Sequence, residues 1–496
     1  MTDTRRQNGS ANGIAGRVPT GLYIDGAWCE GTGTISVTNP ALGEEVIQVA
    51  NGTAVHARRA MDAAARAQPS WARVAPRQRA NLLHAAHRLM LEREELIVTA
   101  MTLESGKPLT EARAEFRLSA DFLLWFAEQT AHLHGSYAMS SHGGFRVLVA
   151  RQPIGPCLLI TPWNFPLLMI VRKAGAALAA GCTTITKSAK ETPMTGALFT
   201  QALHDAGFPP GVANLIHTRT SAEISETLLQ DSRLRKISFT GSTEVGSQLL
   251  GLAAGNIVNA SMELGGDGPF IVLDDADIDL AVDQAIICKF RNAGQACVAA
   301  NRIIVDRKVE GAFTERFVDK VRLLQVGNGM DPVDVGPMIS ARQRDRLYDT
   351  LQDLTRAGGE VLVGGRALQM PGFFFEPTVV RFDGPNEVMC SNELFAPIAT
   401  IFAVDGVRQA IDFANTSRFG LASYIFTRDL TRAVALGEQL EFGMVGINRG
   451  IMADPAAPFG GTKASGIGRE AGQEGIYEFM ESKYMAVTVQ DSGAIL

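Results

Sequence analysis

The sequence predicts an α/β protein in which helices cover largely parallel sheets. Short apolar strands alternate with helical segments from residue 156 to residue 266, and a second run of the same kind begins at residue 269. This βαβα order is typical of parallel sheets covered by helices, a common platform for nucleotides. With 496 residues and a hydrophobic content of 46%, the chain is long enough for two to four domains with more than one core.

The N-terminal part is expected to hold short strands followed by helices. Residues 1–20 look like a solvated tail, and residues 21–31 and 34–40 look like short strands and turns. From residue 53 to about residue 129, apolar residues recur at spacings of three and four, which predicts helices. Residues 145–155 then alternate like a strand and interrupt the helical run.

The first βαβα run is expected to hold four strands, with helices that end at Gly181 and Gly207. The strand segments are CLLITPW, CTTITKSA, VANLIHTRT and KISFTG. In the second run, the expected strands are PFIVLDD, NRIIVD and VLVGG, and the expected helices are DLAVDQAIICKFRNAG, GAFTERFVDKVRLLQ and RLYDTLQDLTRAGG. The last strand candidate, KYMAVTVQ, is expected to pair with residues 145–151.

The overall composition excludes several classes of partner. The formal net charge is −6 without a block of like charge, so we expect neither nucleic acid nor an anionic membrane as the main partner. No apolar run reaches the length of a membrane span, and the first twenty residues lack the apolar middle of a secretory signal. Six cysteines without a CxxC pair favour a reducing compartment, and we expect a cytoplasmic protein.

Histidine and cysteine spacing gives no support for a metal site. All eight histidines lie at or before His217, and none forms a cluster with cysteines or carboxylates at metal-ligand spacing. We therefore expect no metal.

Two glycine-rich segments are candidates for a dinucleotide loop. Residues 466–471 (GIGREA) match the usual fingerprint, but no strand precedes them, so we reject that match. In FTGSTEVG a strand runs into the glycines and a helical segment follows. There Gly241 and Gly246 would let the backbone approach a pyrophosphate at a helix N-terminus, with Ser242 as a further donor. The alternative is that this turn only caps the helix.

Polar side chains also follow two other strands of this run. Asn164 carries an amide between two prolines in ITPWNFP, and it could equally belong to an ordinary capped helix start. Lys187 and Lys190 end the next strand, where a cofactor ribose would lie in such a sheet. The alternative is that both lysines are simply solvated.

A cysteine and a glutamate are candidates for nucleophile and base. Cys297 lies in a polar turn in GQACVAANR, whereas structural cysteines more often lie inside apolar runs. Glu263 precedes the Gly-Gly turn of MELGG and is the nearest carboxylate candidate for a base. Taken alone, Glu263 could be a solvated turn residue.

Six motifs together resemble the aldehyde dehydrogenase superfamily in their order and spacing. The resemblance covers almost the whole chain from about Gly21. Within the superfamily, RKAGAALAAGC, KFRNAGQAC and the C-terminal KYM are most similar to succinate-semialdehyde dehydrogenases. The six motifs are ITPWNFP, FTGSTEVG, MELGG, FRNAGQAC, NELFAP and PFGGTKASGIGRE.

The resemblance implies a Rossmann-like NAD(P)-binding domain, an α/β catalytic domain and a small β appendage. We expect the first domain at residues 21–130 and 154–265, and the second at residues 266–480. The appendage, at residues 131–153 and 481–496, would join subunits into a homodimer or homotetramer.

The resemblance also implies a reaction. Cys297 would attack an aldehyde, the Asn164 amide and the Cys297 backbone N–H would hold the oxyanion, and Glu263 would activate the hydrolytic water. Trp163 and Ser242 would lie along the cofactor phosphates, Lys187 would hold the adenosine ribose, and Glu393 would bond the nicotinamide ribose beside Phe395.

Lys190 departs from the family pattern, which usually has a glutamate there. A cation beside Lys187 should attract the 2′-phosphate of NADP, so we expect NADP to be preferred and NAD to be usable.

Substrate recognition is implied by two arginines. Arg172 and Arg291 match those that bind the substrate carboxylate in succinate-semialdehyde dehydrogenases, although each could be an ordinary helix-surface arginine. Ala453 stands where a serine ligand is expected, and Asp454 could repel an anion. A neutral aldehyde, transfer of the acyl group to coenzyme A, and a non-catalytic nucleotide-binding scaffold remain as alternatives.

Overall fold

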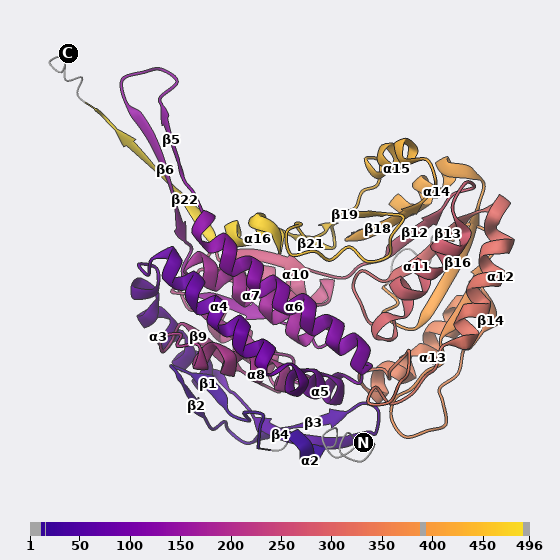
Figure 1. The fold of residues 1–496 in the computed structure, drawn as a ribbon, viewed down its shortest axis with the longest axis horizontal. Coiled ribbons are helices and arrows are strands. Elements are labelled where there is room, and N and C mark those ends of the chain that lie inside the picture. The colour runs from indigo at the N-terminus through magenta and orange to yellow at the C-terminus, as the bar shows by residue number, and fades with distance from the viewer. Residues whose placement is uncertain (1–10, 15, 387–392, 490–496) are drawn as a thin grey trace.

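Two sheets organise the chain, each covered by helices (Figure 1). The computed structural model describes residues 11–14, 16–386 and 393–489. One sheet has eight strands in the order β2-β1-β9-β8-β7-β10-β11-β21, and the other has seven in the order β14-β15-β16-β13-β12-β18-β19. The predicted α/β fold is confirmed. No helix within the described part of the chain is long and apolar enough to cross a bilayer.

The eight-stranded sheet contains the four strands expected from the first βαβα run. Strands β7 to β11 run parallel, so their carboxyl ends share one edge. The chain passes from β7 outward to β8 and β9 and then returns to β10 on the other side, so the strand order switches direction between β7 and β10. The strands are β1 (Leu22–Ile24), β2 (Ala27–Cys29), β7 (Cys157–Ile160), β8 (Thr184–Lys187), β9 (Ala213–Ile216), β10 (Lys236–Thr240), β11 (Asn259–Glu263) and β21 (Gly466–Ile467).

Helices cover this sheet, and α7 (Pro166–Ala180) is buried along its whole length. Its apolar sequence suits that position, and it ends as expected at Gly181, which has a positive φ of 94°. The helices expected between residues 53 and 129 are present. They are α3 (Ala54–Trp71), α4 (Pro76–Glu92), α5 (Glu94–Ser105) and α6 (Leu109–Gln129). Three further helices follow the strands β8, β9 and β10 in turn: α8 (Pro193–Asp205), α9 (Ser221–Leu229) and α10 (Thr243–Ala254).

The seven-stranded sheet is parallel except at β14, which pairs antiparallel with β15. The sequence analysis identified three of its strands and three of its helices, but not the strands between residues 378 and 447. The strands are β12 (Gly268–Val272), β13 (Ala300–Asp306), β14 (Glu360–Val363), β15 (Thr378–Phe382), β16 (Ile398–Val404), β18 (Ala422–Phe426) and β19 (Met444–Ile447). The helices are α11 (Ile278–Phe290), α12 (Arg307–Leu323), α13 (Ala341–Arg356), α14 (Gly406–Asn415) and α15 (Leu430–Gly437).

A three-stranded arm projects from the body (Figure 1). It contains β5 (Ser136–Met139), β6 (Arg146–Pro153) and β22 (Met480–Val487). The pairing expected between the C-terminal strand and residues 145–151 is confirmed, with Lys483 opposite Ala150. Residues 490–496 of this predicted segment lie outside the described residues.

The N-terminal segment differs from the solvated tail expected there. Residues 1–10 lie outside the described residues, but α2 (Ala11–Ile14) is followed by a packed turn, and Ile14 and Val18 are buried. The remaining elements are small. They are β3 (Thr34–Asn39), β4 (Glu44–Ala50), η1 (Thr130–His132), η2 (Arg291–Gly294), β17 (Phe419–Gly420), β20 (Thr462–Lys463) and α16 (Gly472–Tyr477).

One short strand crosses from the C-terminal part of the chain into the first sheet. β21 lies in the range expected for the second domain, yet Gly466 and Ile467 pair antiparallel with Glu263 and Met262 of β11. The rejected GIGREA motif is therefore an edge strand beside Glu263 rather than a loop between a strand and a helix.

Candidate active site

The predicted site residues gather at the carboxyl edge of the eight-stranded sheet. Asn164 and Trp163 follow β7, Ser242 follows β10, and Glu263 is the last residue of β11. Because β7 and β10 flank the point where the strand order switches, these side chains lie where open α/β sheets usually bind ligands.

The turn that carries Cys297 has an unusual backbone. Asn292 and Ala293 both adopt left-handed conformations, with φ of 53° and 54°. Gln295 fastens the turn, because its side-chain amide donates to Asn292 O (3.0 Å) and its side-chain oxygen accepts from Ile339 N (3.0 Å). Left-handed non-glycine residues in a fastened turn are typical of functional sites.

Asn164 is anchored beside this turn. Its side-chain amide donates to the carbonyl oxygen of Gln295 (3.0 Å), two residues before Cys297. Its own carbonyl oxygen accepts from Lys107 Nζ (2.7 Å), and Lys107 forms an ion pair with Glu115, with both side chains buried. The side-chain oxygen Oδ1 of Asn164 has no hydrogen-bond partner within the described residues. The amide is thus held at the nucleophile candidate by a buried ion pair that the sequence analysis did not identify.

The MELGG segment that contains Glu263 packs against the backbone of Cys297 through Gly266. A Cβ atom on Gly266 would come within 2.1 Å of the carbonyl oxygen of Cys297, so only glycine permits the MELGG turn to approach this closely. Glu263 is buried, and its Oε2 atom has no partner among the described residues. Burial, and next the charge of Glu470, raise its pKa well above the ordinary value. In its ionised form, such a carboxylate is a stronger base than an ordinary glutamate.

Cys297 is a free, partly buried thiol. Burial, and next the charge of Glu393, raise its pKa to about 12 in the protein without bound ligands. The thiolate fraction therefore grows as the pH rises, and it does not reach a plateau below that value.

We expect alkylation of Cys297 by iodoacetamide to accelerate about tenfold per pH unit between pH 7 and pH 9. Peptide mass spectrometry at timed intervals would measure this, with the partly buried Cys29 as an internal comparison. A rate that levels off near pH 8 would mean that the thiol has an ordinary pKa.

Arg172 occupies a different environment from the substrate-facing one predicted for it. Its side chain is 1% exposed, and its Nε atom donates to Glu470 Oε2 at 2.9 Å, with a second bond from Nη2. The guanidinium carbon lies 3.9 Å from the ring centroid of Phe459. Lys173 also forms an ion pair with Glu470. Burial alone would raise the pKa of Glu470, but Lys173 and Arg172 outweigh it and lower that pKa to about 2.

The sequence analysis missed Glu470 and Phe459 as neighbours of Arg172. The available signal was the position of Glu470 inside GIGREA, a motif that we had rejected for another role. The charge of Arg172 is already matched by a buried carboxylate.

We expect Glu470→Gln to destabilise the protein by about 3–5 kcal/mol, because two buried cations lose their partner. Urea denaturation followed by circular dichroism would measure the free energy of unfolding. Glu441→Gln is the matched control, since Glu441 pairs with Lys463 at the surface and should contribute less than about 1 kcal/mol. Equal losses in the two variants would contradict the prediction.

Arg291 remains available to an anion. It is half-buried, its guanidinium carbon lies 5.2 Å from the ring centroid of Phe165, and no carboxylate of the described residues is within ion-pair distance. Asp454, which could have repelled an anion, is exposed and accepts a hydrogen bond from Ala456 N (2.8 Å). Ala453 is half-buried and offers no polar side chain.

The loops after β8 and β10 suit a dinucleotide. Lys187 is buried, burial lowers its pKa to about 8, and its Nζ donates to the Ser221 hydroxyl (3.0 Å). Ser242 caps α10, and its hydroxyl accepts from Val245 N (3.4 Å). Gly241 and Gly246 leave no room for a side chain, because a Cβ atom would collide with Phe239 and Leu264 respectively.

Two aromatic rings and a carboxyl group lie at the other end of this surface. The rings of Trp163 and Phe395 meet edge to face with centroids 5.6 Å apart. Glu393 accepts from Gly266 N (3.2 Å), and burial raises its pKa to about 8. A cofactor between Lys187 and Glu393 would meet hydrogen-bonding groups at both ends, so the residues present fit the dinucleotide that the sequence predicts.

A pocket of about 690 Å³ adjoins this surface. Trp163 and Lys190 line it, and Lys190 is exposed, with Glu191 as an ion-pair neighbour at 3.9 Å.

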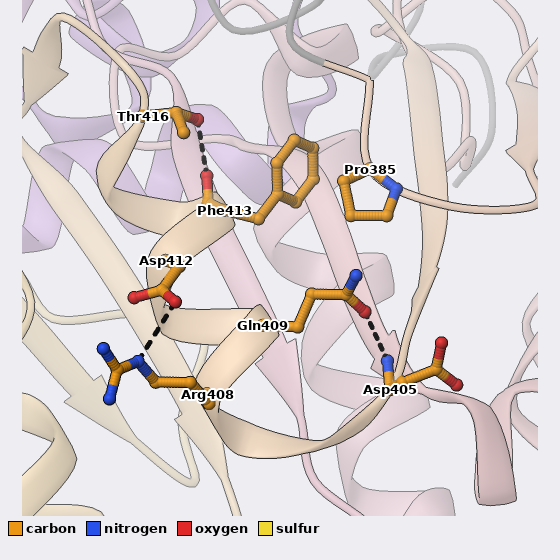
Figure 2. Close-up of a pocket in the computed structure, with 7 residues that line it drawn as sticks. All are labelled: Pro385, Asp405, Arg408, Gln409, Asp412, Phe413 and Thr416. Atoms are coloured by element: carbon orange, nitrogen blue, oxygen red, sulfur yellow. Dashed lines mark hydrogen bonds and ion pairs between the residues drawn. The ribbon is translucent and has the colours of Figure 1, made fainter.

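A second pocket, of about 460 Å³, lies against α14 (Figure 2). Its polar side chains are engaged locally. Arg408 pairs with Asp412 at 3.1 Å, and Gln409 accepts from Asp405 N at 2.6 Å. None of its lining residues belongs to the candidate active site, so we assign it no role in catalysis. No group of three His, Cys, Asp or Glu in the described ranges could hold a metal ion.

Comparison with known proteins finds one family along most of the chain. The sequence model of the aldehyde dehydrogenase family matches residues 28–485. A succinate-semialdehyde dehydrogenase of Paenarthrobacter nicotinovorans is 46% identical over 88% of this chain and 98% of its own length. A glutarate-semialdehyde dehydrogenase of Pseudomonas aeruginosa is 42% identical over 94% and 97%. A crystal structure of an E. coli NADP-dependent enzyme superposes with a TM-score of 0.93 at 41% identity, over 95% of this chain and 98% of that one.

Proposed function

Because the chain belongs to the aldehyde dehydrogenase family, we propose that it oxidises succinate semialdehyde to succinate with NADP as the preferred oxidant. It is an NAD(P)-dependent aldehyde dehydrogenase. The observation that carries the proposal is the convergence of Cys297, Asn164 and Glu263 near Arg291. Arg291 forms no ion pair with a carboxylate among the described residues.

The three converging side chains have distinct roles in this proposal. The Cys297 thiolate attacks the aldehyde carbon and forms a thiohemiacetal, whose oxyanion is held by the Asn164 amide and the Cys297 backbone N–H. When bound, the nicotinamide cofactor accepts the hydride that leaves this carbon, and a thioester remains on Cys297. Glu263 then takes a proton from the water that hydrolyses the thioester.

The presence of a buried base favours hydrolysis over the alternatives. Glu263 gives water a proton acceptor at the thioester, which transfer of the acyl group to coenzyme A does not need. A scaffold without catalysis would have no use for a nucleophile and a buried base on two turns whose backbones pack together at Gly266 and Cys297.

Arg291 supports a substrate that carries a carboxylate. Because Arg172 is matched by Glu470, Arg291 is the cation of the predicted pair that remains for the substrate. The named relatives act on succinate semialdehyde and on glutarate semialdehyde, which differ by one methylene. One methylene is worth only about tenfold to two-hundredfold in discrimination, so both aldehydes belong in the test.

Initial rates with succinate semialdehyde, glutarate semialdehyde and butanal, each with NADP and NAD, test the proposal. We expect the highest kcat/KM for succinate semialdehyde with NADP. In Arg291→Gln, the KM for the semialdehyde should rise about tenfold or more, while the values for butanal should stay the same. The matched control is Arg316→Gln, which removes a surface arginine paired with Asp279.

Two results would overturn separate parts of this proposal. Equal turnover of butanal would contradict the assignment of a carboxylate-bearing substrate and leave the assignment of the catalytic residues unaffected. A higher kcat/KM with NAD than with NADP would contradict the proposed preference for NADP, which rests on the positive charge of Lys190 close to Lys187.

The arm supports a proposal on assembly. Exposed apolar side chains on β5 and β22, among them Tyr137, Met139 and Tyr484, would be covered if the arm bound a second copy of the chain. We propose a homodimer or homotetramer joined through this arm, with residues 21–130 and 154–265 as the cofactor domain and residues 266–480 as the catalytic domain.

A further inference from the structure

The pocket of about 690 Å³ beside the candidate cofactor surface is strongly cationic. Two of its basic side chains come from loops that follow parallel strands: Lys190 after β8 and Arg219 after β9. Since β8 and β9 are neighbours, both cations lie at the same edge of the eight-stranded sheet. The other two, Arg342 and Arg346, come from α13, which belongs to the seven-stranded half of the chain.

The two arginines of α13 act from one helix face. They are four residues apart, so their side chains lie on the same side of the helix. Ser340 caps α13 and accepts from Gln343 N (3.3 Å), and both residues line the pocket. The amino end of a sixteen-residue helix therefore opens into the pocket and adds to its positive potential.

The positive charge of the pocket is largely unmatched. Among the described residues, no carboxylate lies within ion-pair distance of Arg219, Arg342 or Arg346. Two carboxyl groups line the pocket, Glu191 and Glu104. Glu104 is buried, burial raises its pKa to about 8, and its oxygens accept from the backbone amides at the start of α8. At neutral pH it is therefore mostly protonated and does little to offset the four cations.

We propose that this pocket binds a phosphate monoester, the 2′-phosphate of the dinucleotide, and that Arg219, Arg342 and Arg346 select NADP over NAD. The inference rests on the cofactor assignment made above and extends it to residues outside the known motifs. Lys187, expected at the ribose, is the last residue of β8, and Lys190 lines the pocket three residues later. A phosphate on that ribose would be held from both halves of the chain.

Arginine suits this task better than lysine alone. Its planar guanidinium donates two parallel hydrogen bonds to phosphate oxygens, and such charge-assisted bonds are about twice as strong as neutral ones. The three arginines are exposed, and none of them forms an ion pair with a carboxylate among the described residues. A ligand that binds them therefore does not have to break an ion pair.

Isothermal titration of the full-length protein with NADP and NAD tests the proposal without any turnover. We expect the double variant Arg342→Gln/Arg346→Gln to bind NADP about tenfold or more weakly and NAD within about twofold of the unaltered protein. Arg219→Gln should show the same selectivity. Arg356→Gln is the matched control, because Arg356 is exposed on the same helix, pairs with Asp353 and does not line the pocket.

Two further probes separate the sources of phosphate. 2′,5′-ADP should lose affinity in the double variant, whereas 5′-AMP should not. If titration with inorganic phosphate weakens while NADP binding is unchanged, the pocket holds a free anion and the assignment to the cofactor is overturned. If the affinities for NADP and NAD fall together, or neither falls, the arginines do not recognise the 2′-phosphate. These readouts are independent of the aldehyde and of kcat/KM, so failure of the proposed function would be seen separately, in the rate measurements.

Discussion

Cys297→Ala is expected to abolish aldehyde oxidation, with kcat reduced about 10⁴-fold or more. The reaction has no alternative nucleophile in the packed contact between the MELGG turn and the Cys297 turn, and loss of a nucleophile removes the whole covalent route. Initial rates with succinate semialdehyde and NADP would measure the loss. Binding of NADP by titration should persist, because the side chains proposed to hold the dinucleotide are unchanged in this variant.

Cys29→Ser is the matched control for this variant. Cys29 is also free and partly buried, but it lies on β2 at the far edge of the eight-stranded sheet. Its substitution should leave kcat within about twofold of the unaltered protein. Substantial activity in Cys297→Ala, with the protein folded, would remove Cys297 from the mechanism.

Glu263→Gln is expected to slow the reaction about 10²-fold to 10⁴-fold by removing the base for thioester hydrolysis. The substitution keeps the shape of the side chain, so the first half of the reaction should survive. Rapid mixing should therefore give a burst of NADPH close to one equivalent per active site, followed by a slow steady state.

The pH dependence of Glu263 has a definite sign. Its raised pKa means that the carboxyl group is protonated at low pH and becomes a base only as the pH rises through that value. Activity should therefore rise with pH on the acid side of the profile, and Glu263→Gln should lose that rise. Glu438→Gln, at an exposed helix end, should keep the profile unchanged. A variant Glu263→Gln without a burst would place the defect before hydrolysis and contradict the assigned role.

Local patterns in the sequence predicted the main features of the site. Asn164 and the Lys187–Lys190 pair lie at or just after the ends of predicted strands, and parallel strands place their carboxyl ends together, so their convergence was predictable. The strand β11, which ends at Glu263, was not among the predicted strands, so Glu263 was singled out only by its place before the Gly-Gly turn of MELGG. Helix ends at Gly181 and Gly207 were also local signals, since both glycines adopt positive φ.

Features that depend on distant contacts were not predictable in this way. Arg172 meets Glu470 across 298 positions of sequence, and nothing in the helix that carries Arg172 reveals that partner. Asn164 is supported by the buried pair of Lys107, in the link between α5 and α6, and Glu115, on α6. The α13 arginines reach the pocket only because the two halves of the chain face each other there.

The residues from Gly466 to Val487 complete structures that were begun far earlier in the chain. β21 closes the edge of the eight-stranded sheet beside β11, Glu470 neutralises Arg172 and Lys173, and β22 pairs with β6 over eight residues. Such long-range closure makes folding slow, because loop-closure entropy is lost before the contacts form. A chain still on the ribosome, or one cut short before residue 466, therefore holds two buried cations without their partner and an open sheet edge. The architecture therefore makes completion of synthesis a condition for stability.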